Sequence, residues 1–114
     1  MSINVPRNTE VIVDITILNQ IGDVSATQLF DPPVNGVFRV SAYSDTQATN
    51  AIPVNLLLSW NDGLGMMLRV IEVDRLGLIR TSVIHGVPGQ TVTYGTQTFG
   101  NPDPYNLHIL VEQL

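Results

Sequence analysis

The 114-residue chain contains no cysteine and no lysine. Without cysteine it can form neither a disulfide framework nor a thiolate metal site. Without lysine it lacks the side chain that Schiff-base chemistry and P-loops require. Apolar runs are short: Leu56-Leu57-Leu58 is typical, whereas a membrane helix needs ~20 residues. The start, Met1 to Arg7, has no basic region followed by a long apolar stretch, so we expect no signal peptide and a soluble protein.

Positive charge is scarce and scattered. Ten Asp and Glu residues stand against five arginines, and the formal net charge is -5 at pH 7. Proteins that bind DNA or RNA cluster Lys and Arg against the phosphates, so we expect no nucleic-acid partner. Charged residues make up 13% of the chain, compared with roughly 25% in typical soluble domains. This composition indicates a surface that partly meets other protein. A neutral surface rich in Thr, Asn and Gln is the alternative.

Apolar residues recur with a period of two, which is typical of half-buried β-strands. Val11, Val13, Ile15 and Ile17 are therefore expected to share one face of the first strand. Turn signals separate the alternating segments, and the Asp62-Gly63 pair favours a hairpin. We expect strands over residues 10–17, 24–30, 37–43, 54–60, 66–73, 78–84, 91–94 and 105–112.

The alternation also assigns side chains to the two faces of a strand. In the third segment one set should face the core and the other should face outward, namely Phe38, Val40 and Ala42 against Arg39, Ser41 and Tyr43. The last segment divides in the same way, with Tyr105, Leu107, Ile109 and Val111 opposed to Asn106, His108, Leu110 and Glu112. For the outward Arg39, pairing across an interface and exposure to water are both open.

Eight short strands and the lack of any segment with helical spacing indicate an all-β protein. We expect a two-sheet β-sandwich and, within that class, a jelly roll of about eight short antiparallel strands. An immunoglobulin-like sandwich is the alternative, although no cysteine pair flanks Trp60. Residues 1–9 are expected to form an N-terminal arm, and residues 10–114 a single β-sandwich domain.

No recognisable constellation for catalysis or metal binding is present. His85 and His108 lie in different elements, whereas a catalytic zinc site usually takes three protein ligands in fixed geometry. Asp62 lacks the regular spacing of a calcium loop, so we expect it to stabilise a turn instead. There is no Gly-x-Ser-x-Gly elbow, and no two acidic residues can be paired into a glycosidase site from sequence. We therefore expect no enzyme activity, no metal and no cofactor.

Exposed aromatic side chains can mark a sugar-binding face. Phe38 and Trp60 fall on apolar alternations and are expected in the core. Tyr43 and Phe99 lie at loop margins and are the better candidates for ligand contact.

One resemblance goes beyond the fold class. The segments 25–43 (SATQLFDPPVNGVFRVSAY), 91–96 (TVTYGT) and 105–112 (YNLHILVE) look like parts of small proteins encoded among bacteriophage structural genes. In such proteins a Pro-containing turn and a Gly-aromatic-Arg-Val strand precede a Thr-rich strand and a C-terminal Tyr…Val-Glu strand; here Val37 stands between Gly36 and Phe38. The Phe-x-x-Pro-x-x-Gly-Val-Phe portion, residues 30–38, also resembles trimeric jelly rolls of the C1q and tumour-necrosis-factor type.

The resemblance implies a virion component made in the host cytoplasm: a capsid decoration (cement) protein, a head fibre or a tail appendage. Its implied partners are the major capsid protein or other virion proteins, and further copies of itself, most simply a homotrimer. The arm residues Ile3, Val5, Pro6 and Arg7 are the expected capsid or subunit contacts. The alternative is a carbohydrate- or receptor-binding module of a phage tail or head appendage, which would use Tyr43, Phe99 and neighbouring Asp and Asn residues for stacking and hydrogen bonds. A tail-tube or head-completion protein is a third option.

Overall fold

The computed structural model describes residues 10–45, 54–73, 79–100 and 102–114. The arm residues Ile3, Val5, Pro6 and Arg7 thus lie outside the described residues. The described chain forms eight strands, which are β1 (Glu10–Gln20), β2 (Thr27–Phe30), β3 (Gly36–Asp45), β4 (Val54–Asn61), β5 (Met66–Val73), β6 (Arg80–Gly86), β7 (Val92–Gln97) and β8 (Tyr105–Gln113).

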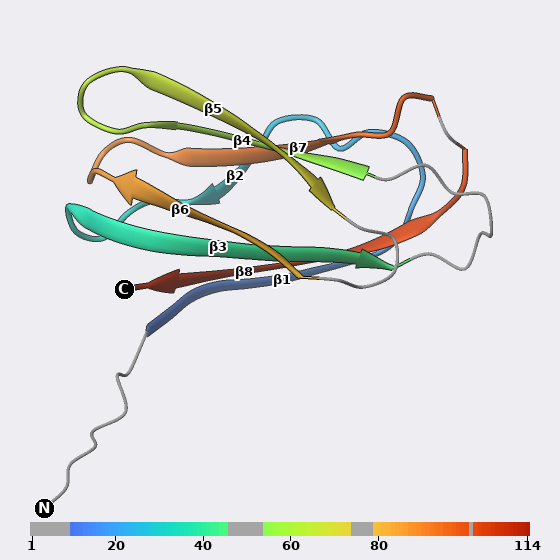
Figure 1. Ribbon diagram of the computed structural model, residues 1–114, viewed down its shortest axis with the longest axis horizontal. Helices are drawn as coiled ribbons and strands as arrows, with labels where there is room; N and C mark the ends of the chain where they lie inside the picture. Colours follow the sequence, from blue (N-terminus) through green and yellow to red (C-terminus); the bar gives the residue numbers. More distant parts are fainter. Residues whose placement is uncertain (1–9, 46–53, 74–78, 101) are drawn as a thin grey trace, which may run out of the picture.

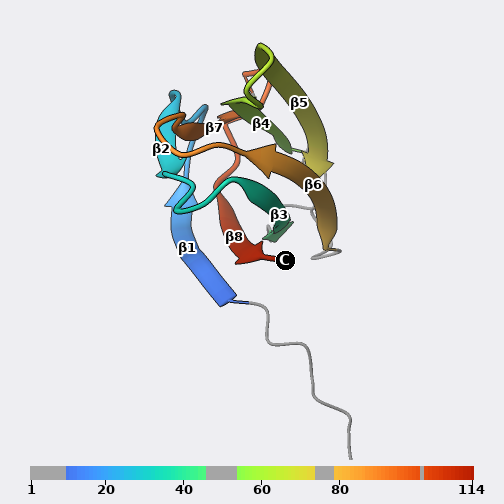
Figure 2. The same cartoon turned by 90° about the vertical axis from the view of Figure 1, so that its left-hand side faces the viewer.

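The strands pair antiparallel in two four-stranded sheets, in the orders β1-β8-β3-β6 and β2-β7-β4-β5. The sheets lie face to face (Figures 1 and 2). Of the successive strand pairs, only β4 and β5 are neighbours in one sheet; each other step crosses to the opposite sheet. This is the strand order of a jelly roll. The expected two-sheet, all-β fold is confirmed.

The core fills the space between the sheets because each central strand turns every second residue inward. In β3, β4 and β8 buried and half-buried residues alternate, as the sequence predicts. Phe38, Leu56, Leu58 and Leu107 are completely buried. Trp60 is buried as expected, so both aromatic core assignments are correct.

The turn between β4 and β5 confirms the structural role expected for Asp62. Its carboxylate accepts hydrogen bonds from the backbone N–H groups of Leu64 (2.8 Å) and Gly65 (3.2 Å). The Asn61 side chain accepts a third from Gly63 N–H at 2.8 Å. Gly63 has a φ of 96°, a conformation that favours glycine. The side-chain oxygens of Asn61 and Asp62 therefore accept hydrogen bonds from the backbone of the turn itself.

The expectation for Val11 is wrong. A register shift lies between Val11 and Val13 in the pairing of β1 with β8, and Val11 is exposed. Val13, Ile15 and Ile17 pack against the core as expected. A bulge of this kind changes which face the following residues occupy, so strict alternation cannot hold across it.

The strand expected over residues 24–30 begins only at Thr27, because the preceding residues are held by a side chain. Thr96 Oγ1 accepts from Val24 N–H at 2.7 Å, and Val24 C=O accepts from Thr96 N–H at 3.0 Å. Thr96 Oγ1 also lies 2.8 Å from the Tyr105 hydroxyl, which donates to Gly22 C=O at 2.9 Å. These bonds fix the β1–β2 connection against β7 and β8.

Candidate functional site

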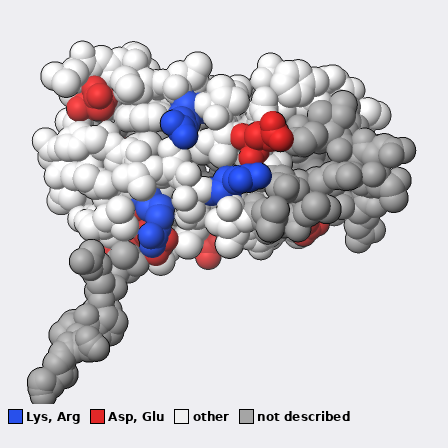
Figure 3. All heavy atoms as spheres, in the orientation of Figure 1, with Lys and Arg blue, Asp and Glu red and all other residues white. Residues whose placement is uncertain are grey.

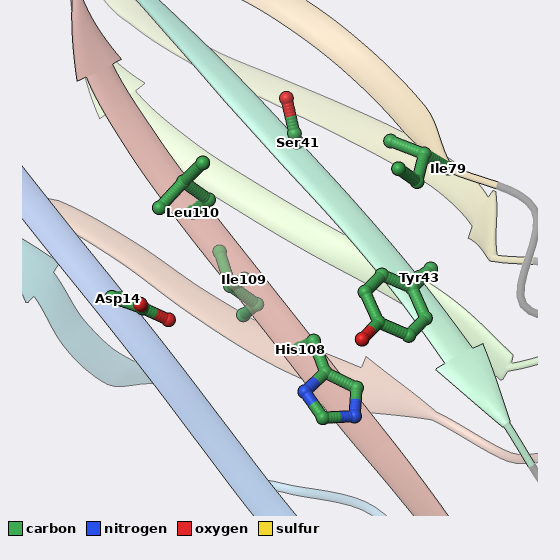
Figure 4. Close-up of a pocket in the computed structure, with 7 residues that line it drawn as sticks. All are labelled: Asp14, Ser41, Tyr43, Ile79, His108, Ile109 and Leu110. Atoms are coloured by element: carbon green, nitrogen blue, oxygen red, sulfur yellow. The ribbon is translucent and has the colours of Figure 1, made fainter. Parts of the chain in front are cut away.

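The outer face of the β1-β8-β3-β6 sheet carries a hollow of about 230 Å³. Three neighbouring strands and the residue that precedes β6 supply its lining: Asp14 from β1; Ser41 and Tyr43 from β3; His108, Ile109 and Leu110 from β8; and Ile79 before β6 (Figure 4). Ser41, Tyr43, His108 and Leu110 reach this face because each is an outward residue of its alternating strand. The hollow is thus a product of strand order and register.

Tyr43 and His108 form the aromatic part of the hollow. They are direct cross-strand partners, and their rings stack with centroids 4.3 Å apart and planes inclined by 15°. His108 Nδ1 also lies 3.3 Å from Thr16 Oγ1, its partner on β1. The histidine is therefore held between two strands, and it fixes the orientation of the Tyr43 ring.

The arrangement offers groups that suit a small polar ring. Asp14, Ser41 and the Tyr43 hydroxyl supply hydrogen-bonding oxygens, while Leu110 and Ile79 supply apolar surface. Stacking on an aromatic side chain together with hydrogen bonds from an acidic residue is the chemistry that the sugar-binding alternative requires. The sequence alone does not single out Asp14 and His108 as companions of Tyr43. Their outward alternation was a signal, but only the strand register shows that they meet.

Phe99, the second ligand candidate, does not line this hollow. It lies in the β7–β8 connection with its side chain 61% exposed. Its φ is 58° and that of Gly100 is 79°, so two successive residues adopt the left-handed conformation. A bulky residue rarely takes this conformation, and here it keeps the ring outside the core. The structure thus separates the two aromatic candidates.

A second depression, next to Phe99, is lined by residues of the β1–β2 and β7–β8 connections, including Asp23, Thr98 and Gly100. Asp23 accepts from both the N–H and the hydroxyl of Thr98, each at 2.8 Å. These bonds hold the pKa of Asp23 below its ordinary value, with the hydroxyl contributing most. The Asp23 carboxylate therefore links the β1–β2 connection to the β7–β8 connection.

Arg39 is paired within the chain. Its guanidinium group lies 3.0 Å from a Glu112 oxygen, and Nε donates to the same atom at 3.1 Å. The two residues are direct partners in the pairing of β3 with β8. The sequence leaves open pairing across an interface and exposure to water. The structure shows a third arrangement, because Arg39 pairs with a neighbouring strand of its own chain.

Over the described ranges, no group of three or more His, Asp or Glu side chains is arranged to hold a metal ion. Within the same residues, there is no helix with the length and apolar character needed to cross a membrane. No protein-family model matches the chain, and comparison with curated proteins and with solved structures finds no match.

Proposed function

We propose that this protein is a non-enzymatic bacteriophage structural protein that decorates the outer surface of the capsid as a homo-oligomer. The observation that carries the proposal is a jelly roll whose surface is poor in charge and rich in exposed apolar side chains, including Leu64, Met66 and Leu68. A surface of this kind suits contact with other protein. The resemblance of segments 25–43, 91–96 and 105–112 to phage structural proteins supplies the virion context.

In this proposal the N-terminal residues bind the shell. Ile3 and Val5 offer apolar side chains, Pro6 restricts the backbone, and Arg7 adds a positive charge to an acidic chain. A segment that precedes the first strand can dock on a neighbouring protein without disturbing the sandwich.

Deleting residues 2–9 is expected to abolish capsid binding while the domain stays folded. The test is co-sedimentation of the purified chain with virus particles that lack it, with the full-length protein as reference. Circular dichroism of the truncated protein checks the fold. Full decoration by the truncated protein would show that the shell is bound by another surface.

A carbohydrate-binding module is the second candidate, and the hollow beside Tyr43 and His108 is the feature in its favour. A glycan screen of the purified protein tests it. A ligand bound by the wild type and lost in Tyr43→Ala supports this function, with Phe99→Ala as a matched aromatic control outside the hollow. Absence of binding to every sugar in the screen argues against it.

A further inference from the structure

The edge strand β5 is unusually apolar on its exposed side. Met66 and Leu68 are each 70% exposed, and Leu64, in the turn that precedes the strand, is 96% exposed. Met67 and Val70 are exposed as well, so the first five residues of the strand are all accessible. The side of the molecule on which β5 and β6 lie (Figure 2) shows a few charged groups of both signs, some of them adjacent, on an otherwise uncharged surface (Figure 3).

β5 also has fewer of the features that keep sheet edges from pairing with other chains than the other three edge strands. Proteins protect an edge strand by making it short, by bulges, or by proline and charged residues, lysine above all. β2 has four residues and a register shift, and β1 contains two register shifts. β6 presents Arg80, Thr81 and His85. β5 has eight residues, pairs with β4 without a shift, and carries neither proline nor lysine; its two charged residues are Arg69 and Glu72.

The backbone of β5 has free hydrogen-bonding groups on this edge. The Asp62 N–H donates to Gly65 C=O at 3.3 Å where the β4–β5 hairpin closes. Hydrogen-bonded and non-hydrogen-bonded pairs alternate along an antiparallel ladder. Counted from this bond, Met67 and Arg69 exchange bonds with β4, and the N–H and C=O groups of Met66, Leu68 and Val70 point to the open edge.

We propose that β5 pairs antiparallel with β5 of a second copy of this chain, around a two-fold axis. Residues that lie opposite each other in a sheet point to the same face. In a two-fold antiparallel pair, the axis therefore passes between two copies of the same residue. With Leu68 on the axis, Met66 faces Val70 of the second copy, so Met66, Leu68 and Val70 pair among themselves and Glu72, which has the same parity, lies beyond them. A shift that centres the pair on Arg69 brings two guanidinium groups directly opposite each other, which is unfavourable.

A second copy is the occupant that fits this edge best. The alternating apolar sequence of Met66, Leu68 and Val70 is complementary to itself when one strand is reversed. Pairing through one short strand buries an area at the low end of specific interfaces, about 1,200 Å² in total or less. The association should therefore depend on concentration in solution.

The inference rests on the self-association included in the proposed function, and it specifies the surface. Light scattering behind a sizing column, at several concentrations, should give masses that rise from 12.5 kDa toward twice that value. Leu68→Lys should weaken the association at least tenfold because the pair would place two charges on the axis. Leu18→Lys is the control, since Leu18 is similarly exposed (64%) on the distant edge strand β1, and it should behave as wild type.

Hydrogen exchange on the wild-type protein gives a second readout that needs no variant. The amides of Met66, Leu68 and Val70 should exchange more slowly at concentrations where the larger species forms. Leu68→Thr keeps a residue that favours strands and serves if the lysine variant does not fold. A wild type that stays monomeric overturns both the self-association and its assignment to β5. A trimer, which a two-fold pair cannot form, overturns only the assignment to β5, and so does a dimer that Leu68→Lys and Leu68→Thr leave intact.

Discussion

Replacing Phe38 by alanine is expected to lower the free energy of unfolding by about 3–5 kcal/mol, the usual cost of removing a buried phenylalanine ring. Phe38 is completely buried in β3, and its ring centroid lies 5.2 Å from that of Phe30. A Cβ atom added at Gly86 would come within 2.8 Å of the Phe38 ring, which shows how tightly the site is filled. The two sheets enclose the resulting cavity, so it can collapse only in part.

Chemical denaturation measures the loss, and a thermal melt should show a midpoint lowered by on the order of 10 °C or more. The matched control is Phe99→Ala, because the Phe99 side chain is 61% exposed and not part of the core. That variant should stay within about 0.5 kcal/mol of wild type. Equal losses in the two variants would contradict the assignment of Phe38 to the core.

Gly95→Ala should have the second-largest effect, a loss of about 1–3 kcal/mol typical of an overfilled site. A Cβ atom at Gly95 would lie 2.9 Å from the backbone oxygen of Val24. That oxygen accepts the hydrogen bond from Thr96 N–H at 3.0 Å. The backbone must move to make room, and the bonds that hold the β1–β2 connection to β7 would lengthen.

Gly65→Ala is the control, since a Cβ atom there meets nothing within 4 Å. Urea denaturation of both variants should show a lowered midpoint for Gly95→Ala alone. Hydrogen exchange at Val24 and Thr96 should also quicken in that variant. Wild-type stability in Gly95→Ala would mean that the connection does not pack against β7 as described.

Much of the fold could be predicted from the sequence because central strands impose a simple period. Every expected strand corresponds to an observed one, and β5 begins and ends at the predicted residues. The alternations of β3 and β8 assign their inward and outward side chains correctly. This succeeds because a sandwich buries one face of each central strand and leaves the other half-exposed.

The remaining features depend on contacts between residues far apart in the sequence. The bulge beside Val11 is defined by pairing with β8, and the delayed start of β2 by the Thr96 side chain. The Tyr43–His108 stack requires β3 and β8 to be neighbours in one particular register. Alternation gives the face of each residue, but it contains no information about which strand lies alongside or how far it is shifted.

The composition of β5 shows a related limit. A run such as Met66–Val73 is compatible with a strand buried on both faces, and length and periodicity alone do not separate this case from an edge strand. In the structure, Ile71 and Val73 are buried while the first five residues are exposed. β5 is also the last strand in its sheet order, a position that the sequence alone does not give.

The most direct test of the proposed function is the amount of this chain in purified virus particles. Particles from a culture that carries the gene would be banded on a density gradient, and the chain quantified by mass spectrometry relative to the major capsid protein. The account predicts a fixed ratio between the two proteins across independent preparations and successive gradients. A chain that is missing from the particles, or whose amount falls with each gradient as contaminants do, would contradict it.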